Sequence, residues 1–333
     1  MADVRTPLLE DRALLPAPVV VVVDHPIFLR VCHSPWPCIT QTVLVYLRAF
    51  VVAYLTALGI MLLDYNLDGQ EDAHTAWSIV FQFPTLAFVL LWIYHIIAFS
   101  WTFTHLYYPD VDQEDRRWEY MVLRLMSPPF QTLRSRNRLY FSLFYTAVHV
   151  FVFTNALLYW GVAVPLGHGH FPGGSDPAIW ATNGDLFGDG WFAPFCIINL
   201  YGVTAFIAFL EITIFNSIKR QVPVPTHVFA LMFLLSSYLG FAAFGKLLTG
   251  HSPFFWLDPD FAGRTEILAA YCAAFTLLGP TVFAFMYGLI GMRENIARRD
   301  DHAPPFNPEQ FAREVARDVA RDVRQELDRQ TGA

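Results

Sequence analysis

The chain has 333 residues, of which 55% are hydrophobic, 16% are aromatic and 15% are charged, and its formal net charge is −7. This composition is typical of a chain that is surrounded mostly by lipid, and it does not favour nucleic-acid binding. A soluble helical protein of this length is also disfavoured, because it would have to cover six helices that are apolar on all sides.

Residues 1–38 form the expected N-terminal tail. They lack a basic start followed by a long apolar stretch, so we expect no cleavable signal peptide and insertion directed by the first span. Cys32 and Cys38 precede that span, either as free thiols or as sites of S-acylation. An acidic dileucine pattern consists of Glu10, Leu14 and Leu15. Sorting adaptors for endosomes and vacuoles read such patterns, although chance matches are frequent.

Six apolar stretches follow, each long enough to cross the roughly 30 Å hydrocarbon layer as a helix. The sequence predicts an all-α polytopic membrane protein whose transmembrane domain covers residues 39–292. The expected spans are 43–63, 77–104, 139–164, 191–216, 226–248 and 266–291. Pro84 and Pro280 predict kinks in the second and sixth spans. Gly240 and Gly245 predict close packing of the fifth span.

Basic residues are sorted between alternate connections. Apart from Lys246 and Arg264, every Lys and Arg lies in the N-terminal tail, at the start of the first span (Arg48), or after the second, fourth or sixth span. Lys and Arg are retained on the cytoplasmic side of a membrane. Both termini are therefore predicted to be cytoplasmic, and the plasma membrane or an endomembrane, including a vacuolar or endosomal one, is the expected location.

Two amphipathic helices are expected outside the spans. Residues 117–126 read RWEYMVLRLM, which predicts a short helix at the inner membrane interface. The alternative is that these charges only determine topology. In the C-terminal tail, 293–333, apolar residues recur every four positions after Asn307-Pro308, a typical helix start, and predict a helix over 308–330. That helix is either solvated or a surface for a homo-oligomer or a protein partner.

Polar side chains inside the spans define the expected site, because such groups are costly in lipid and usually face the interior of a helical bundle. This intramembrane polar set consists of His95, His149, Asn155, Asn199, Glu211 and His227. If His95, Glu211 and His227 converge, they suit structural hydrogen bonding, a general base or a proton relay. Their spacing lacks a ligand pattern such as HExxH, so no metal is predicted. No cofactor is expected either.

Three segments resemble the rolling stone and androgen-induced-gene family of membrane proteins. They are the stretch from Asn199 to Glu211, the sequence QVPVPTHVFALMFLLSSYLGFAAF, and the outward sequence HSPFFWLDPD. The six-span layout and Tyr46-Leu47-Arg48 at the first span add to this resemblance. It implies a six-span fold with cytoplasmic termini.

Some members of that family look like hydrolases of fatty-acid esters of hydroxy fatty acids, with an intramembrane Thr nucleophile and a His in the fourth span. This chain has the sequence SIVFQ where that Thr would fall, and its fourth span contains no His. The resemblance therefore implies the fold without the catalytic residues. We consider Thr85 with His149 as a substitute pair.

The residues favour a multi-pass membrane protein without a recognisable catalytic motif, which binds membrane lipids or acts as a scaffold. Two alternatives stay open. One is an intramembrane lipid-ester hydrolase with a relocated nucleophile, and the other is a small proton-coupled transporter.

Overall fold

The computed structural model describes residues 27–67, 77–108, 117–129, 135–167 and 192–300. Within these ranges the chain is helical and has no strand, and six helical stretches are long and apolar enough to cross a membrane. These stretches are Gln41–Leu67, Phe83–Tyr107, Arg136–Ala163, Pro194–Phe215, Val224–Thr249 and Thr265–Ala297. The predicted all-α fold with six membrane-spanning helices is confirmed.

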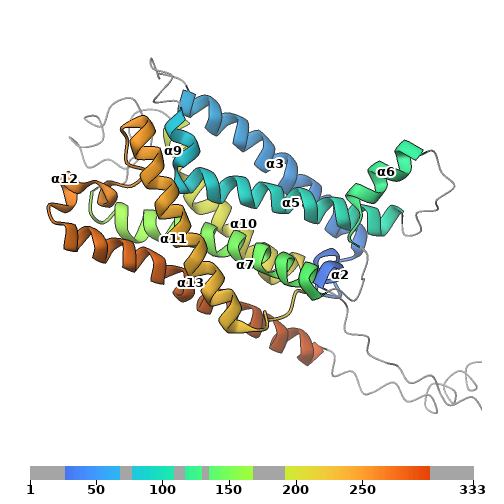
Figure 1. The fold of residues 1–333 in the computed structure, drawn as a ribbon. Coiled ribbons are helices and arrows are strands. Elements are labelled where there is room, and N and C mark those ends of the chain that lie inside the picture. Colours follow the sequence, from blue (N-terminus) through green and yellow to red (C-terminus); the bar gives the residue numbers. More distant parts are fainter. Residues whose placement is uncertain (1–26, 68–76, 109–116, 130–134, 168–191, 301–333) are drawn as a thin grey trace, which may run out of the picture.

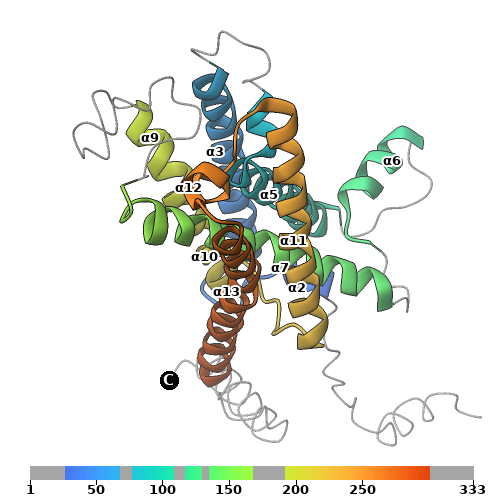
Figure 2. The same ribbon diagram turned by 60° about the vertical axis from the view of Figure 1, so that its left-hand side comes forward.

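The spans form one bundle with the third span near its centre. The elements that build the spans are α3 (Gln41–Leu67), α5 (Phe83–Tyr107), α7 (Ser135–Leu158), η3 (Tyr159–Ala163), α9 (Phe192–Ile198), η4 (Asn199–Val203), α10 (Thr204–Leu210), η5 (Glu211–Phe215), α11 (Val224–Thr249) and α13 (Thr265–Asp300). Short elements are α2 (Ile27–Cys32), η2 (Ser78–Phe81), α6 (Arg117–Met126), η6 (Phe255–Leu257) and α12 (Pro259–Ala262). The helix α7 contacts α5, α10, α11 and α13 (Figures 1 and 2).

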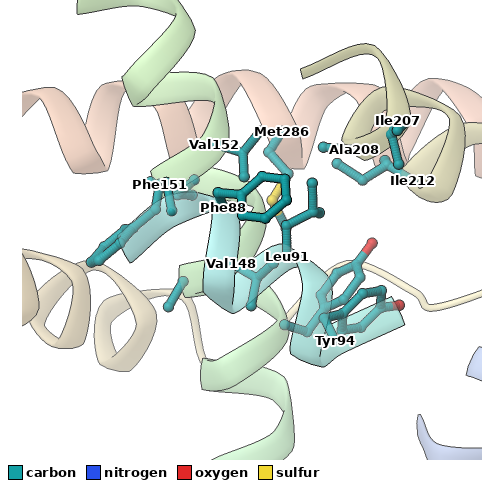
Figure 3. Packing of buried hydrophobic residues seen from close by; sticks show 14 of the residues in the cluster. Phe88, Leu91, Tyr94, Val148, Phe151, Val152, Ile207, Ala208, Ile212 and Met286 are labelled. Carbon is teal, nitrogen blue, oxygen red and sulfur yellow. The ribbon is translucent and has the colours of Figure 1, made fainter. Parts of the chain in front are cut away.

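Apolar side chains from four spans meet where α5, α7, α10 and α13 come together. Figure 3 shows Phe88 and Leu91 of α5 packed with Phe151 of α7, and Met286 of α13 beside them. Ile207 and Ile212 contribute from the fourth span (Figure 3). Because lipid tails are as apolar as these side chains, the packing stabilises the bundle mainly through van der Waals contact.

The predicted kink at Pro84 is replaced by a helix boundary. Gln82 is extended, with φ −76° and ψ 134°, and α5 begins at Phe83 with Pro84 in its first turn. Proline fits the first turn because its missing N–H would have no partner there. The span expected from residue 77 is thus the short 3₁₀ turn η2 followed by a separate helix. By contrast, α13 continues through Pro280.

The fourth span contains two π-helical turns. It runs through α9, the π turn η4, α10 and the π turn η5. Asn199 and Glu211, both in the predicted polar set, are the first residues of these two turns. A π turn accommodates one extra residue in a helix and is frequent at functional sites.

The described part of the expected N-terminal tail packs onto the end of the bundle. Val31 and Cys32 of α2 are fully buried. Ser34 Oγ donates to the carbonyl of Ile214 at 2.7 Å, and Trp36 Nε1 donates to the carbonyl of Thr213 at 2.8 Å. Residues 27–36 therefore cover carbonyl groups at the end of the fourth span, which a helix leaves without intrahelical partners.

Cys32 and Cys38 yield a labelling prediction. Cys32 is buried, and burial raises the pKa of its thiol to about 12, whereas Cys38 is exposed. Because maleimides react with the thiolate, Cys32 should stay unreactive until the pH approaches that value. We expect a membrane-impermeant maleimide to modify Cys38 alone of these two in vesicles whose cytoplasmic face is outside, as read by peptide mass spectrometry. Modification of Cys32 at neutral pH would contradict the packing of α2.

The helix predicted over 117–126 is present as α6 and projects away from the bundle (Figures 1 and 2). Trp118, Met121 and Leu125 are exposed on it. Its end is attached to the second span, because Thr104 Oγ1 donates to the carbonyl of Met126 at 3.2 Å. Its position at the membrane interface stays a prediction. The dileucine pattern, Arg134, and the helix over 308–330 lie outside the described residues.

Only one of the two glycines singled out in the fifth span makes a close contact. A Cβ atom on Gly245 would lie 2.4 Å from Cγ of Phe81, whereas a Cβ on Gly240 would meet nothing within 4 Å. Gly245 therefore allows η2 to pack against α11. Tyr238 strengthens this contact by donating to the carbonyl of Phe81 at 3.1 Å.

We expect Gly245→Ala to lower stability by about 1–3 kcal/mol, because overpacking displaces the Phe81 ring and the turn that carries it. Gly240→Ala is the matched control. It should leave stability unchanged or raise it slightly, since alanine favours a helix over glycine. The measurement is the thermal unfolding midpoint of each variant in detergent, and equal midpoints for the two variants would show that the contact is not rigid.

Candidate functional site

A buried ion pair joins the first and fourth spans. Arg48 Nη2 donates to Glu211 Oε1 at 2.9 Å, and neither side chain has any exposed surface. Tyr94 Oη donates to the same oxygen at 2.7 Å, and Asn216 Nδ2 lies 3.3 Å from it. Charge-assisted hydrogen bonds of this kind hold a carboxylate in one orientation. We call Arg48, Tyr94, His95, His149 and Glu211 the polar centre.

The polar centre is tied to backbone groups on both sides. Arg48 Nη2 also lies 2.8 Å from the carbonyl of Val31 in α2 and 3.0 Å from that of Phe215 in η5. One guanidinium group thereby links the N-terminal segment, the first span and the end of the fourth span. The π turn η5 places Glu211 opposite this group.

His95 and His149 lie beside the ion pair. The centroid of the Tyr94 ring is 5.4 Å from that of the His95 ring and 5.1 Å from that of the His149 ring. Both imidazoles are fully buried. His149 Nδ1 lies 2.7 Å from the carbonyl of Tyr145. Since a carbonyl only accepts, Nδ1 carries the proton and Nε2 is an acceptor in neutral His149.

Several atoms of the polar centre are buried without a hydrogen-bond partner among the described residues. They are Arg48 Nε and Nη1, Glu211 Oε2, both ring nitrogens of His95, and His149 Nε2. Each such atom costs free energy, about 1–3 kcal/mol, and bulk water is absent from the bilayer core. Because these groups need partners, their accumulation around one ion pair suits a site that holds polar groups from outside the protein, such as water or the head of a ligand.

Of the three residues whose convergence the sequence left open, His95 and Glu211 both lie beside Tyr94, whereas His227 contacts other residues. Its Nε2 is 2.9 Å from Ser142 Oγ, and its Nδ1 is 2.9 Å from the carbonyl of Pro223. The ring is parallel to that of Phe283, with centroids 6.0 Å apart. Because Nδ1 donates to the carbonyl, Nε2 accepts the hydroxyl proton of Ser142.

Asn155 and Asn199 form hydrogen bonds at and beside the π turn η4. Asn155 Nδ2 donates to the carbonyl of Leu200 at 3.2 Å, and Asn199 Nδ2 donates to that of Phe195 at 2.8 Å. Tyr54 Oη of the first span donates to Asn199 Oδ1. These amides satisfy local backbone groups and join neighbouring spans, which is a structural role.

Thr85 is not near His149. Thr85 lies in the first turn of α5, whereas Tyr94, nine residues later, is the α5 residue that contacts the His149 ring. At 1.5 Å per residue, this separation is about 13 Å along the helix. The two side chains considered as a substitute nucleophile and base therefore lie at different depths.

Sequence reasoning missed several residues of the site and its supports. Arg48 and Arg293 were not assigned to the polar site, yet they are 0% and 4% exposed. A signal was available for Arg48, because it lies within the first apolar stretch and Glu211 lies at a similar distance from the same membrane face. Tyr94, Tyr145 and Asn216 carried no such signal.

Arg293 supports the polar centre from the sixth span. Its Nη1 donates to the carbonyl of Asn216 at 2.8 Å and to Asn216 Oδ1 at 3.1 Å. It also donates to the carbonyls of Ile212 and Ile218. These bonds hold the end of η5, and Asn216 in turn contacts Glu211.

The six spans and the buried centre between them define an integral, multi-pass membrane protein. In the part of the chain that the structure describes, His, Cys, Asp and Glu form no group of three or more that could hold a metal ion. Neither a scan against protein-family models nor searches of curated proteins and of solved structures finds a match to the chain.

Proposed function

We propose that the protein binds the polar part of a membrane lipid at the polar centre. The observation that carries this proposal is the group of buried atoms without a protein partner around Arg48 and Glu211. A lipid can bring a polar head to such a site while its acyl chain stays among apolar side chains. The distant relationship to the rolling stone and androgen-induced-gene family is also proposed, and the six-span layout supports it.

We further propose a plasma-membrane or endomembrane location with cytoplasmic termini. The sorting of basic residues supports this orientation. The first and last described helices, α2 and the end of α13, lie at the same end of the bundle (Figure 1). In this orientation the polar centre lies in the cytoplasmic half of the membrane. A scaffolding or oligomeric role of the helix predicted over 308–330 is tested by deleting residues 304–333, and an unchanged size in detergent counts against it.

Lipid binding is tested with His95→Phe. His95 has no hydrogen bond to the described protein, so this change removes its ring nitrogens without breaking a hydrogen bond, although the six-membered ring is slightly larger. The wild-type protein and the variant are purified from the same membranes, and their bound lipids are quantified by mass spectrometry. We expect a lipid class enriched in the wild type over the bulk membrane and reduced in the variant. Identical lipid profiles that match the bulk membrane would reject the proposal.

A lipid-ester hydrolase is the second candidate, and the Ser142–His227 pair favours it. In this hypothesis His227 Nε2 takes the Ser142 proton while Oγ attacks the ester carbonyl, and the alcohol leaves with a proton from His227. Water then releases the acyl group by the reverse transfer. A hydroxyl within 2.9 Å of a histidine whose other nitrogen is held by a carbonyl is the arrangement that this chemistry needs.

A fluorophosphonate probe distinguishes this candidate from a structural hydrogen bond. We expect a nucleophilic Ser142 to be labelled in the wild type and not in Ser142→Ala. Thr146→Ala is the matched control, because Thr146 lies one turn further along α7 and its hydroxyl only donates to the Ser142 carbonyl at 2.8 Å. Absent labelling, or labelling that survives in Ser142→Ala, would dismiss the hydrolase.

A further inference from the structure

The donors and acceptors of the polar centre are mixed. Arg48 Nε and Nη1 can only donate, whereas Glu211 Oε2 and His149 Nε2 accept. A neutral His95 adds one donor and one acceptor through its two ring nitrogens. A group that satisfies the centre must therefore both donate and accept hydrogen bonds.

The charge of the ion pair further restricts which head groups can bind at the polar centre. The formal charges of Arg48 and Glu211 cancel within the ion pair, at 2.9 Å. A carboxylate or a phosphodiester would bring a second negative charge beside Glu211, and it has no proton for Glu211 Oε2 or His149 Nε2. An ammonium group would bring a second positive charge beside Arg48 and leave the guanidinium donors without an acceptor. Each choice leaves buried polar atoms unsatisfied.

A hydroxyl group meets both requirements. Its oxygen accepts from Arg48 Nε or Nη1 while its proton goes to Glu211 Oε2 or His149 Nε2, and it adds no charge. Two neighbouring hydroxyl groups can serve both sides of the centre. We propose that the polar centre selects a neutral, hydroxyl-bearing head group. This inference rests on the proposed lipid binding and names the class of lipid.

The test compares amphiphiles that share one acyl chain. Full-length protein in a detergent without hydroxyl groups is heated with 1-monooleoylglycerol, oleate, oleylamine, or free glycerol at the same concentration. A ligand that binds only the folded state raises the unfolding midpoint. We expect 1-monooleoylglycerol to raise the midpoint by several degrees and the other three compounds to leave it nearly unchanged.

A variant assigns the shift to the polar centre. His95→Phe should reduce the shift produced by 1-monooleoylglycerol, whereas His251→Phe, in an exposed position between α11 and η6, should retain it. If His95→Phe does not fold, His149→Phe serves instead, because it removes Nε2, one of the acceptors proposed for the ligand hydroxyl. An undiminished shift in the folded variant would overturn the assignment.

The remaining outcomes separate the two proposals. Equal shifts with all three amphiphiles, or a larger shift with oleate or oleylamine, would overturn the head-group inference and leave lipid binding standing. A shift with free glycerol equal to that with 1-monooleoylglycerol would retain the hydroxyl chemistry and reject a lipid ligand. No shift with any compound would reject both, with water as the remaining occupant of the centre.

Discussion

Arg48→Met is expected to destabilise the protein by about 3–5 kcal/mol, because it leaves Glu211 as a buried charge without its cation. The same change also removes a donor from the carbonyls of Val31 and Phe215. We therefore expect a large drop in the thermal midpoint, measured by size-exclusion chromatography after heating, and reduced recovery of monodisperse protein.

The double variant Arg48→Met/Glu211→Gln tests the cause of that loss. It removes both charges, while the glutamine oxygen still accepts the Tyr94 hydroxyl. Breaking one partner of a buried pair costs more than replacing both, so the double variant should be more stable than Arg48→Met alone. If the losses of the two single variants simply add, the two side chains are not energetically coupled.

Arg293→Met is expected to be the second most damaging change, with a loss of about 3 kcal/mol or more. Arg293 is almost fully buried and donates to the carbonyls of Ile212, Asn216 and Ile218. Hydrogen bonds to charged groups contribute about 1.5–3 kcal/mol each, and the carbonyls that are left behind lie where water does not reach easily. The thermal midpoint in detergent measures the effect.

Two further variants test whether stability depends on the several donors that the planar guanidinium group of Arg293 directs at different carbonyls. Arg293→Lys should recover only part of the stability, because a compact ammonium group cannot reach several carbonyls from one position. Arg220→Met is the control on the same side of the bundle. Its ion pair with Glu294 is 3.2 Å long and the Arg220 side chain is 42% exposed, so its removal should cost less than removal of the buried Arg293. Equal losses in Arg220→Met and Arg293→Met would contradict the special role of Arg293.

The ends of the spans show where reasoning along the chain succeeds. The first span was expected over 43–63 and is Gln41–Leu67, and the fifth was expected over 226–248 and is Val224–Thr249. These ends can be read from the sequence, because the thickness of the hydrocarbon layer sets how many consecutive apolar residues a spanning helix needs. The predicted start of the second span was wrong, because the helix begins at Phe83 with Pro84 in its first turn. An apolar run does not distinguish a continuous helix from a turn followed by a helix.

The polar site shows where such reasoning stops. His95 and Glu211 both lie beside Tyr94, whereas His227 faces Ser142 instead. Depth follows from the position along a helix, whereas convergence depends on rotation about the helix axis. In the fourth span a π turn precedes Glu211, and one extra residue rotates all following side chains by about 100°. A periodicity of 3.6 residues therefore cannot place Glu211 on a face.

The sequence by itself determined the class of the protein, the number of spans and the sorting of charge around them, because these depend on how many apolar residues follow one another and where Lys and Arg interrupt them. Only the tertiary structure decided that Arg48 and Arg293 are interior groups, that Glu211 meets Arg48 and Tyr94, and that Ser142 meets His227. These contacts depend on how six helices are rotated and shifted against each other. That arrangement results from packing over the whole bundle, and a local sequence pattern does not predict it.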